Sequence, residues 1–202
     1  MQRGESLIEK DKPPMKSAKI KIIGVGGSGI AILNYIIGEK LSNIDHIAID
    51  TANEGLITSK APFQLIISEN GLESGGNSEI GKSAATKNID YIQNMLTGAD
   101  RLFITGGLGG GTATGTLPVV AEVAQHLNIQ THAVITLPFS LEGAERQRIA
   151  QRGAQSLQKN VGELTLIYND SLLHFAPTNP ALQQLFSLSD RAVGWKILAK
   201  LI

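Results

Sequence analysis

The sequence predicts an α/β fold with three layers, in which a mainly parallel sheet carries helices on both faces. Short apolar runs alternate with longer segments of helical periodicity along most of the chain. Such alternation is typical of parallel sheets built from crossover units. Glycine-rich clusters follow three of the apolar runs, around Gly24, Gly75 and Gly106. Because ligands of such sheets bind beyond the carboxyl ends of the strands, these clusters mark the expected binding edge.

Six short apolar runs are expected to form the strands, at residues 20–23, 44–49, 63–67, 102–104, 131–136 and 164–167. Five longer segments are expected to form helices, at residues 30–37, 79–96, 117–127, 142–158 and 180–202. The second of these helices carries apolar residues at helical spacing from Ile80 to Leu96. A polar, glycine-rich loop across residues 68–78 precedes it.

The composition is that of an ordinary globular protein and excludes several classes of function. The 202 residues are enough for one domain with a sizeable core. Eighteen basic residues balance eighteen acidic ones, so no charge excess favours nucleic acid as a partner. The absence of cysteine excludes disulfides and thiolate metal sites, and the four histidines lack metal-ligand spacing. We therefore expect no protein-bound metal centre.

The ends of the chain give two further expectations. Residues 1–18 are polar, contain Pro13 and Pro14, and are expected to form a disordered leader ahead of one domain at residues 19–202. No apolar stretch reaches the length of about 18 residues that a membrane span requires. We expect a cytoplasmic protein.

The first glycine cluster matches a dinucleotide-binding motif. Gly24-Val-Gly-Gly-Ser-Gly29 fits G-x-G-x-x-G between a strand and a helix, and Asp50 ends the next strand. This is the arrangement that binds NAD, in which the acidic residue contacts the ribose. The alternative is a tight turn between strand and helix without a ligand.

The second cluster matches the P-loop pattern G-x-x-x-x-G-K-[ST] at residues 76–83. A P-loop leaves a strand directly, whereas here several polar residues separate the motif from the third strand. Lys82 and Ser83 would also lie one turn inside a helix that begins near Ser78. We therefore interpret this match as coincidental and Lys82 as a solvated helix residue.

The third cluster, Gly106-Gly-Leu-Gly-Gly-Gly-Thr-Ala-Thr-Gly-Thr116, is explained by neither motif. A dinucleotide-binding domain or a P-loop protein needs one glycine loop, and this chain has three. Glycine lets backbone N–H groups converge on a ligand, and a helix N-terminus favours anions. One ligand with a long phosphate tail, held by several loops, accounts for all three clusters.

In order along the chain, these residues resemble the FtsZ/tubulin family of GTPases, and its FtsZ branch most closely. Residues 109–115 resemble the signature G-G-G-T-G-[ST]-G with one substitution, and residues 22–29 resemble the first nucleotide loop. Residues 71–81 resemble the γ-phosphate loop, residues 138–143 the ribose segment P-F-x-F-E-G, and residues 168–170 the guanine-side P-N-D. Phe186 and Asp190 resemble the start of the central helix, so the likeness runs from about Lys19 to Ile202.

The resemblance implies a Rossmann-like GTPase fold that binds GTP or GDP, with Mg²⁺ on the phosphates. It assigns the phosphates to backbone and hydroxyl groups of Gly26, Gly27, Gly75, Gly76, Gly109, Gly110, Gly111, Thr112 and Gly115. Glu142 would hold the ribose and Arg146 would point at the nucleotide, while Asn169 and Asp190 would read guanine. The alternative interpretations are a favourable charge at a helix N-terminus for Glu142, a surface ion pair for Arg146, a plain turn at residues 169–170 and a solvated Asp190.

Four positions depart from the family pattern. Ala31 stands where FtsZ usually has an asparagine that contacts the base, and Ala113 replaces the middle glycine of the signature. The methyl group of Ala113 is tolerable only if φ is negative there. Tyr168 replaces a proline, and Ala144–Glu145 replaces a commonly basic pair.

In the family, an acidic loop after the central helix completes the active site of the neighbouring subunit in a head-to-tail filament, and a second domain follows. This sequence contains neither. We therefore expect GTP binding with little hydrolysis by the isolated chain, and no catalytic residue within it. FtsZ-type subunits are the expected partners, in a cell-division or cytoskeletal setting. Two alternatives stay open: an NAD-dependent oxidoreductase, and a non-hydrolysing relative that caps or regulates filaments.

Overall fold

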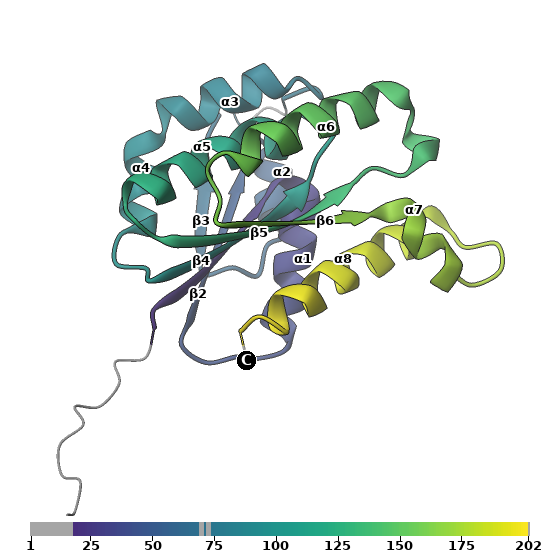
Figure 1. The fold of residues 1–202 in the computed structure, drawn as a ribbon, viewed down its shortest axis with the longest axis horizontal. Helices are drawn as coiled ribbons and strands as arrows, with labels where there is room; N and C mark the ends of the chain where they lie inside the picture. Colours follow the sequence, from purple (N-terminus) through teal and green to yellow (C-terminus); the bar gives the residue numbers. More distant parts are fainter. Residues whose placement is uncertain (1–17, 69–70, 72–73, 202) are drawn as a thin grey trace, which may run out of the picture.

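The computed structural model describes residues 18–68, 71 and 74–201, and its centre is a sheet of six strands. Every neighbouring pair is parallel, and the order across the sheet is β3-β2-β1-β4-β5-β6. The strands are β1 (Ile20–Val25), β2 (Ile44–Asp50), β3 (Phe63–Ile66), β4 (Arg101–Gly107), β5 (Gln130–Leu137) and β6 (Glu163–Tyr168). The predicted parallel α/β sheet is confirmed (Figure 1).

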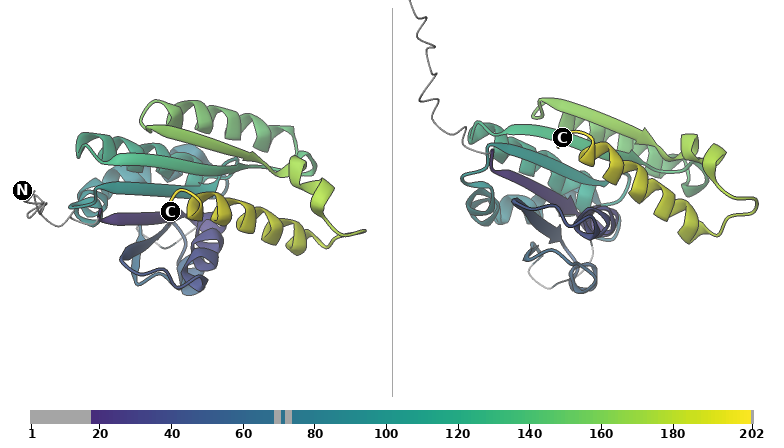
Figure 2. Two further views of the ribbon diagram at one scale, coloured as in Figure 1. Left: turned by 60° about the horizontal axis from the view of Figure 1, so that its bottom comes forward. Right: turned by 90° about the horizontal axis from the view of Figure 1, so that it is seen from below.

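Helices cover both faces of this sheet, as the three-layer prediction requires (Figures 1 and 2). One face carries α1 (Gly26–Gly38) and α8 (Leu182–Leu198), which contact each other. The other face carries α3 (Ser78–Lys87), α4 (Ile89–Leu96), α5 (Thr112–His126) and α6 (Ala144–Gln158). Four short helices complete the fold: α2 (Asn53–Ile57), η1 (Ser140–Glu142), α7 (Asn169–Leu172) and η2 (Leu173–Phe175). These short helices were not predicted from the sequence.

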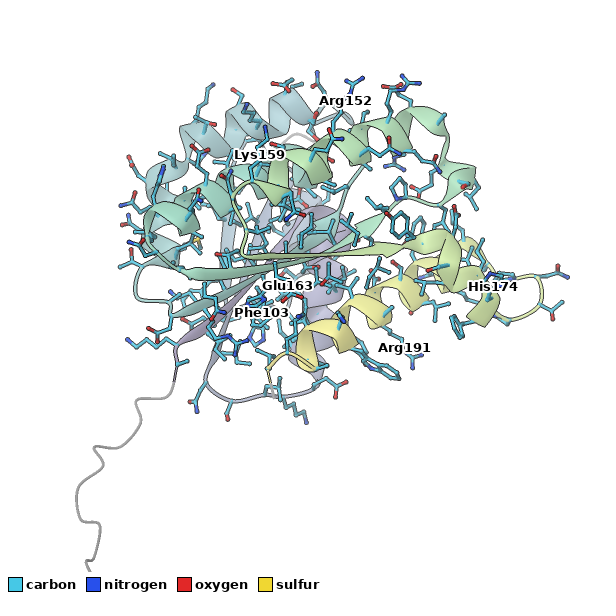
Figure 3. The ribbon with its side chains drawn as sticks, viewed as in Figure 1. Phe103, Arg152, Lys159, Glu163, His174 and Arg191 are labelled. Atoms are coloured by element: carbon cyan, nitrogen blue, oxygen red, sulfur yellow. The ribbon has the colours of Figure 1, made fainter. Side chains whose placement is uncertain are left out.

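The central strands are buried on both faces, which is why they appear in the sequence as unbroken apolar runs. In β4, Leu102 and Ile104 join the core under α3, α4, α5 and α6, whereas Phe103 joins the core under α1 and α8. Figure 3 shows Phe103 and Glu163 in the space between the sheet and α8. Two cores on one sheet hold the strand ends, and the loops that leave them, in fixed positions.

The helix predicted at residues 79–96 is wrong in one respect, because it is two helices that meet at Asn88. The backbone of Asn88 leaves helical geometry, with φ −107° and ψ 21°. Its side-chain amide donates to the carbonyl oxygens of Ile67 (2.9 Å) and Ala84 (3.0 Å). The side chain thus competes with the helix for backbone partners and ties the break to the end of β3.

The glycine clusters are more regular than the predicted loops. Gly106 and Gly107 still pair with β5, and α5 begins at Thr112, so the irregular segment shrinks to residues 108–111. Likewise, α1 begins at Gly26 rather than at residue 30. We expected loops in these segments because glycine and threonine have a low helix propensity. Tertiary packing nevertheless makes them helical.

Other boundaries shift by a few residues. The last helix runs from Leu182 to Leu198 rather than over 180–202. The expected leader falls almost entirely outside the described residues, as does part of the loop at 68–78. No helix in the described part of the chain combines the length and the apolar character needed to cross a membrane.

Candidate functional site

A cavity of about 400 Å³ lies at the carboxyl ends of the strands. Its walls come from the segments that follow all six strands and from α8. Eleven of the thirteen residues proposed from the sequence line it: Gly26, Gly27, Gly75, Gly76, Gly110, Gly111, Thr112, Glu142, Arg146, Asn169 and Asp190. The fold therefore brings together residues that are up to 164 positions apart in the chain.

Two helix N-termini open into the cavity without a side-chain cap. The N-caps are Val25 for α1 and Gly111 for α5, and neither makes a capping hydrogen bond. The first turn of each helix also lacks an acidic residue. The backbone N–H groups and the positive ends of both helix dipoles are thus available to an anion. Gly26 has φ +69°, a backbone geometry that a side chain would strain.

The loop before α3 closes tightly on the start of α5. A Cβ atom on Gly111 would lie 2.2 Å from Oγ of Ser74, so only glycine permits this approach. The Thr112 hydroxyl lies 3.2 Å from the Ser74 hydroxyl and 2.7 Å from that of Thr51. Gly75 and Gly76 have open space where a side chain would be. Both glycines line the cavity, so their backbone is accessible to a ligand.

Gly109 and Gly115 stand apart from the other proposed residues, because they do not line the cavity. The N–H of Gly109 donates to Oγ1 of Thr114 at 3.0 Å, and its φ is +105°. A Cβ on Gly115 would lie 2.1 Å from the carbonyl oxygen of Ser78. The structure therefore gives these glycines a role in the turn and in the packing of α3 on α5.

Glu142 and Arg146 form an ion pair at the cavity wall. Nη1 of Arg146 lies 2.8 Å from Oε2 of Glu142, and Oε1 of Glu142 accepts from the N–H of Phe139 at 2.8 Å. Glu142 is largely enclosed, whereas Arg146 is about half exposed. Among the described residues that line the cavity, Arg146 is the one cation. The surface ion pair and the ligand contact considered from the sequence are thus compatible.

The far end of the cavity is built around the buried Asn169. Its Oδ1 accepts from the hydroxyl of Ser189 on α8 at 2.7 Å, and both residues are almost fully buried. The next residue, Asp170, accepts hydrogen bonds from the Ser140 hydroxyl and from the Ser140 N–H. These two bonds lower the pKa of Asp170. They also join the segment after β5 to the segment after β6.

Three residues of α8 face this end of the cavity at helical spacing: Phe186, Ser189 and Asp190. The ring of Phe186 packs edge-to-face on Phe139, with centroids 5.8 Å apart. Burial raises the pKa of Asp190 to about 7, because the charged carboxylate loses contact with water. Ser189 was missed in the sequence, although its position three residues after Phe186 and one before Asp190 could have indicated it.

The two competing motifs have structural explanations. Lys82 and Ser83 are exposed on α3 and do not line the cavity, as expected for a coincidental P-loop match. Asp50 does line the cavity and accepts from the N–H groups of Thr51 (2.7 Å) and Ala52 (3.3 Å). The strand order is also that of dinucleotide-binding Rossmann domains, so topology alone does not separate the two ligand classes.

The departures from the family pattern fall in different environments. Ala113 lies within α5 and is not among the positive-φ residues, so its methyl group causes no backbone strain. Ala31 is half-buried on α1 and does not line the cavity, and Tyr168 is exposed.

The fold and the cavity together define an α/β domain of the nucleotide-binding class. Residues 19–177 match the model of the tubulin/FtsZ family GTPase domain, and the chain therefore belongs to the tubulin/FtsZ family. This membership does not favour the NAD-dependent alternative.

Solved structures agree with this assignment. FtsZ from M. jannaschii, in a structure described as an empty dimer, is 35% identical with a TM-score of 0.87, and the match covers 91% of this chain and 54% of that one. CetZ2 from Haloferax volcanii, in a GTPγS-bound protofilament, is 22% identical with a TM-score of 0.80, covering 89% and 57%. CetZ1 from the same organism, a GDP-bound monomer, is 23% identical with a TM-score of 0.80, covering 89% and 59%. The two CetZ matches support the fold only, and this chain spans a little over half of each protein.

Proposed function

We propose that this chain binds GTP and GDP in the cavity at the carboxyl edge of the sheet. The phosphates would lie against the uncapped N-termini of α1 and α5, and the base would lie between Asn169 and Asp190. The observation that carries the proposal is the placement of both anion-binding helix ends and this polar pair in one cavity. A carboxylate accepts hydrogen bonds from the ring N–H and the amino group of guanine, and adenine offers no such pair.

Calorimetric titration with GDP, ADP and NAD⁺ tests this proposal. We expect GDP to bind with micromolar or better affinity and the other two ligands to bind far more weakly. A preference for NAD⁺ would restore the dinucleotide interpretation of Gly24–Gly29 and Asp50. Equal affinities for GDP and ADP would show that Asn169 and Asp190 do not read the base.

We further propose that GTP hydrolysis needs a carboxylate supplied by a neighbouring FtsZ-type subunit. Among the described residues that line the cavity, three carry a carboxylate, and each of these already has another environment or role. Asp50 caps backbone N–H groups, and Glu142 is held by Phe139 and Arg146. Asp190 lies at the proposed base end. We therefore expect the carboxylate that activates water at the phosphate end to come from a second subunit.

Phosphate release, measured with and without a full-length FtsZ, separates the possibilities. Release only in the mixture supports a shared active site between subunits. Release by this chain alone would show that its own side chains suffice. No release in either case would favour a nucleotide-binding relative that caps or regulates filaments, and pelleting in the presence of GTP would then show whether it joins them.

Mg²⁺ is proposed to accompany GTP through the phosphate oxygens, which are the hard ligands this ion prefers. The hydroxyl of Thr112 at the start of α5 is the nearest candidate for a protein ligand, because it lies at the phosphate end of the cavity. Titration of GTP with and without EDTA measures this contribution. Unchanged affinity would contradict it.

A further inference from the structure

Ser189 contacts the proposed base end without a role in the function described so far. Its hydroxyl donates to Oδ1 of Asn169 at 2.7 Å. Ser189 is 3% exposed and Asn169 is 4% exposed, so this hydrogen bond is shielded from water. Both residues nevertheless line the cavity. The bond therefore joins α8 to the residue that follows β6, directly at the cavity wall.

In the arrangement that the structure shows, Ser189 donates to Oδ1, and this determines which end of the Asn169 amide a ligand meets. Because Oδ1 is occupied by Ser189, the NH₂ group is the end left for the cavity. Within the part of the chain that the structure describes, Nδ2 of Asn169 has no hydrogen-bond acceptor, and it is not among the fully buried unpaired atoms. Asn169 is also the one carboxamide among the described lining residues.

The backbone around Asn169 is already held, so rotation of the amide is the main freedom that remains. Asp170 accepts from the N–H of Ser140 at 2.9 Å, and the Ser171 hydroxyl donates to the carbonyl oxygen of Tyr168 at 2.7 Å. Without Ser189, the amide could present either its oxygen or its NH₂ group to the cavity. The two ends have opposite hydrogen-bonding character.

We propose that Ser189 is a specificity-determining positioning residue, which holds the Asn169 amide with its NH₂ group toward the purine base. Together with the ionised carboxylate of Asp190, the site then offers one donor and one acceptor. Guanine has a carbonyl oxygen beside a ring N–H and complements this pair. Adenine has an amino group beside an unprotonated ring nitrogen and opposes it at both positions. This inference rests on the proposed guanine-nucleotide binding.

The test compares Ser189→Ala with Ser187→Ala, a serine that is exposed on the same helix. Dissociation constants for GDP and ADP are measured by calorimetry on both variants, on Ser189→Thr and on the unchanged protein. If the Asn169 amide of Ser189→Ala spends about half of its time in the wrong orientation, GDP should bind about twofold more weakly. The freed amide should also accept from adenine, so the preference for GDP over ADP should fall by about tenfold or more.

The Ser187→Ala variant should bind both nucleotides as the unchanged protein does, and Ser189→Thr, which keeps a hydroxyl, should recover the preference. An equal loss of affinity for GDP and ADP in Ser189→Ala would assign Ser189 a purely structural role and overturn the inference. Unchanged constants would overturn it as well. Failure of the unchanged protein to bind GDP would instead refute the proposed function, and the inference with it.

Discussion

The guanidinium of Arg146 lies 2.8 Å from the carboxylate of Glu142, and both side chains line the proposed nucleotide cavity. Glu142 is held a second time by the N–H of Phe139, whereas Arg146 keeps about half of its side chain in solvent. The carboxylate of Glu142 is thus held in place, and the half-exposed guanidinium of Arg146 beside it can interact with a phosphate. Exposed pairs of this kind add little stability, so their position matters more than their energy.

Replacing Arg146 by alanine should weaken GDP binding by about tenfold or more, because charge-assisted hydrogen bonds to phosphate are among the strong ones. The melting temperature without ligand should hardly change. The matched control is Arg148→Ala, since Arg148 is exposed on the same helix and pairs with Glu145. If calorimetry finds an equal loss of GDP affinity for both variants, Arg146 does not contact the nucleotide.

Binding of GDP should strengthen as pH rises through about 7, where Asp190 ionises. The N–H groups of guanine can donate only to the carboxylate form of Asp190, so the affinity scales with the fraction of Asp190 that is ionised. Binding at pH 6 should therefore be about tenfold weaker than at pH 8. The Asp190→Asn variant is the control. The phosphates of GDP titrate in the same way with this variant, but the ionisation of Asp190 is absent. A pH profile that is identical in both proteins would show that Asp190 does not meet the base.

The raised pKa of Asp190 also affects the stability of the protein without ligand. A carboxyl group whose pKa is raised on folding stabilises the folded state below its ordinary pKa, and this contribution is lost as pH rises through the raised value. The free energy of unfolding should therefore fall between about pH 4 and pH 7. Urea titrations should show a flatter profile in Asp190→Asn over that range.

Two glycines of the proposed site should respond oppositely to alanine. Gly27 lies in the first turn of α1 with open space around it, so Gly27→Ala should preserve or slightly raise stability, by about 0.4–1 kcal/mol, while its methyl group obstructs the phosphates. Gly115→Ala would place a Cβ 2.1 Å from the Ser78 carbonyl oxygen and should destabilise the fold by about 1–3 kcal/mol. Denaturant unfolding and GDP titration of both variants test whether Gly27 contacts the ligand and Gly115 serves the packing.

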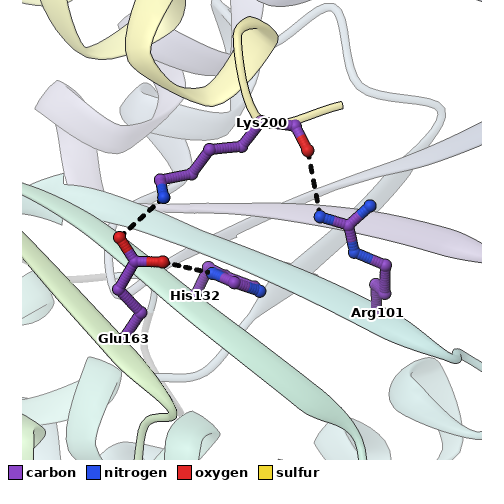
Figure 4. A network of polar contacts seen from close by, with 4 residues as sticks. All are labelled: Arg101, His132, Glu163 and Lys200. Atoms are coloured by element: carbon purple, nitrogen blue, oxygen red, sulfur yellow. Dashed lines mark hydrogen bonds and ion pairs between the residues drawn. The ribbon is translucent and has the colours of Figure 1, made fainter. Parts of the chain in front are cut away.

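A polar network holds the C-terminal end of α8 on the sheet, at the edge opposite the cavity (Figure 4). Lys200 donates to Glu163 at 2.6 Å, Glu163 lies 3.1 Å from Nδ1 of His132, and Arg101 donates to the Lys200 carbonyl oxygen at 2.9 Å. The hydrogen bond from Lys200 is the main cause that lowers the pKa of Glu163. The stabilisation is thus present above the usual pKa of glutamate and is lost as pH falls through the lowered one.

Thermal unfolding of Glu163→Gln should therefore show a lower melting temperature at neutral pH, with a difference from the unchanged protein that shrinks in acid. Glu145→Gln, which breaks an exposed pair on α6, is the control and should have little effect. A Glu163→Gln variant that melts like this control at pH 7 would show that the network does not anchor α8.

The sequence predicted the strands well, because a strand buried on both faces leaves an apolar run that is readable without tertiary information. The starts of α1 and α5 were placed several residues too late, since glycine and threonine suppress helix propensity and only packing shows the helical turn. The break at Asn88 could not be predicted, because the carbonyl oxygen of Ile67 that holds it comes from a distant strand.

For the site, most residues proposed from the ordered motifs do line the cavity, but the motifs did not separate ligand contacts from packing. Gly111 and Gly115 both belong to the signature and both leave no room for a Cβ atom, but only Gly111 lines the cavity. Ser189 carries no motif, and its importance rests on a hydrogen bond to a residue twenty positions away. Asp190 was proposed from the resemblance, whereas its raised pKa depends on burial that spacing cannot show.

The cavity is walled by the segments after all six strands and by α8. A ligand that fills it would contact several of these segments at once and would add its contacts to those of the two cores. Mass action then makes the protein's heat resistance depend on nucleotide supply, by about 2.7 kcal/mol when the ligand is at one hundred times its dissociation constant. Preparations stripped of nucleotide should accordingly be the fragile ones, and cellular nucleotide levels would set how much folded protein persists.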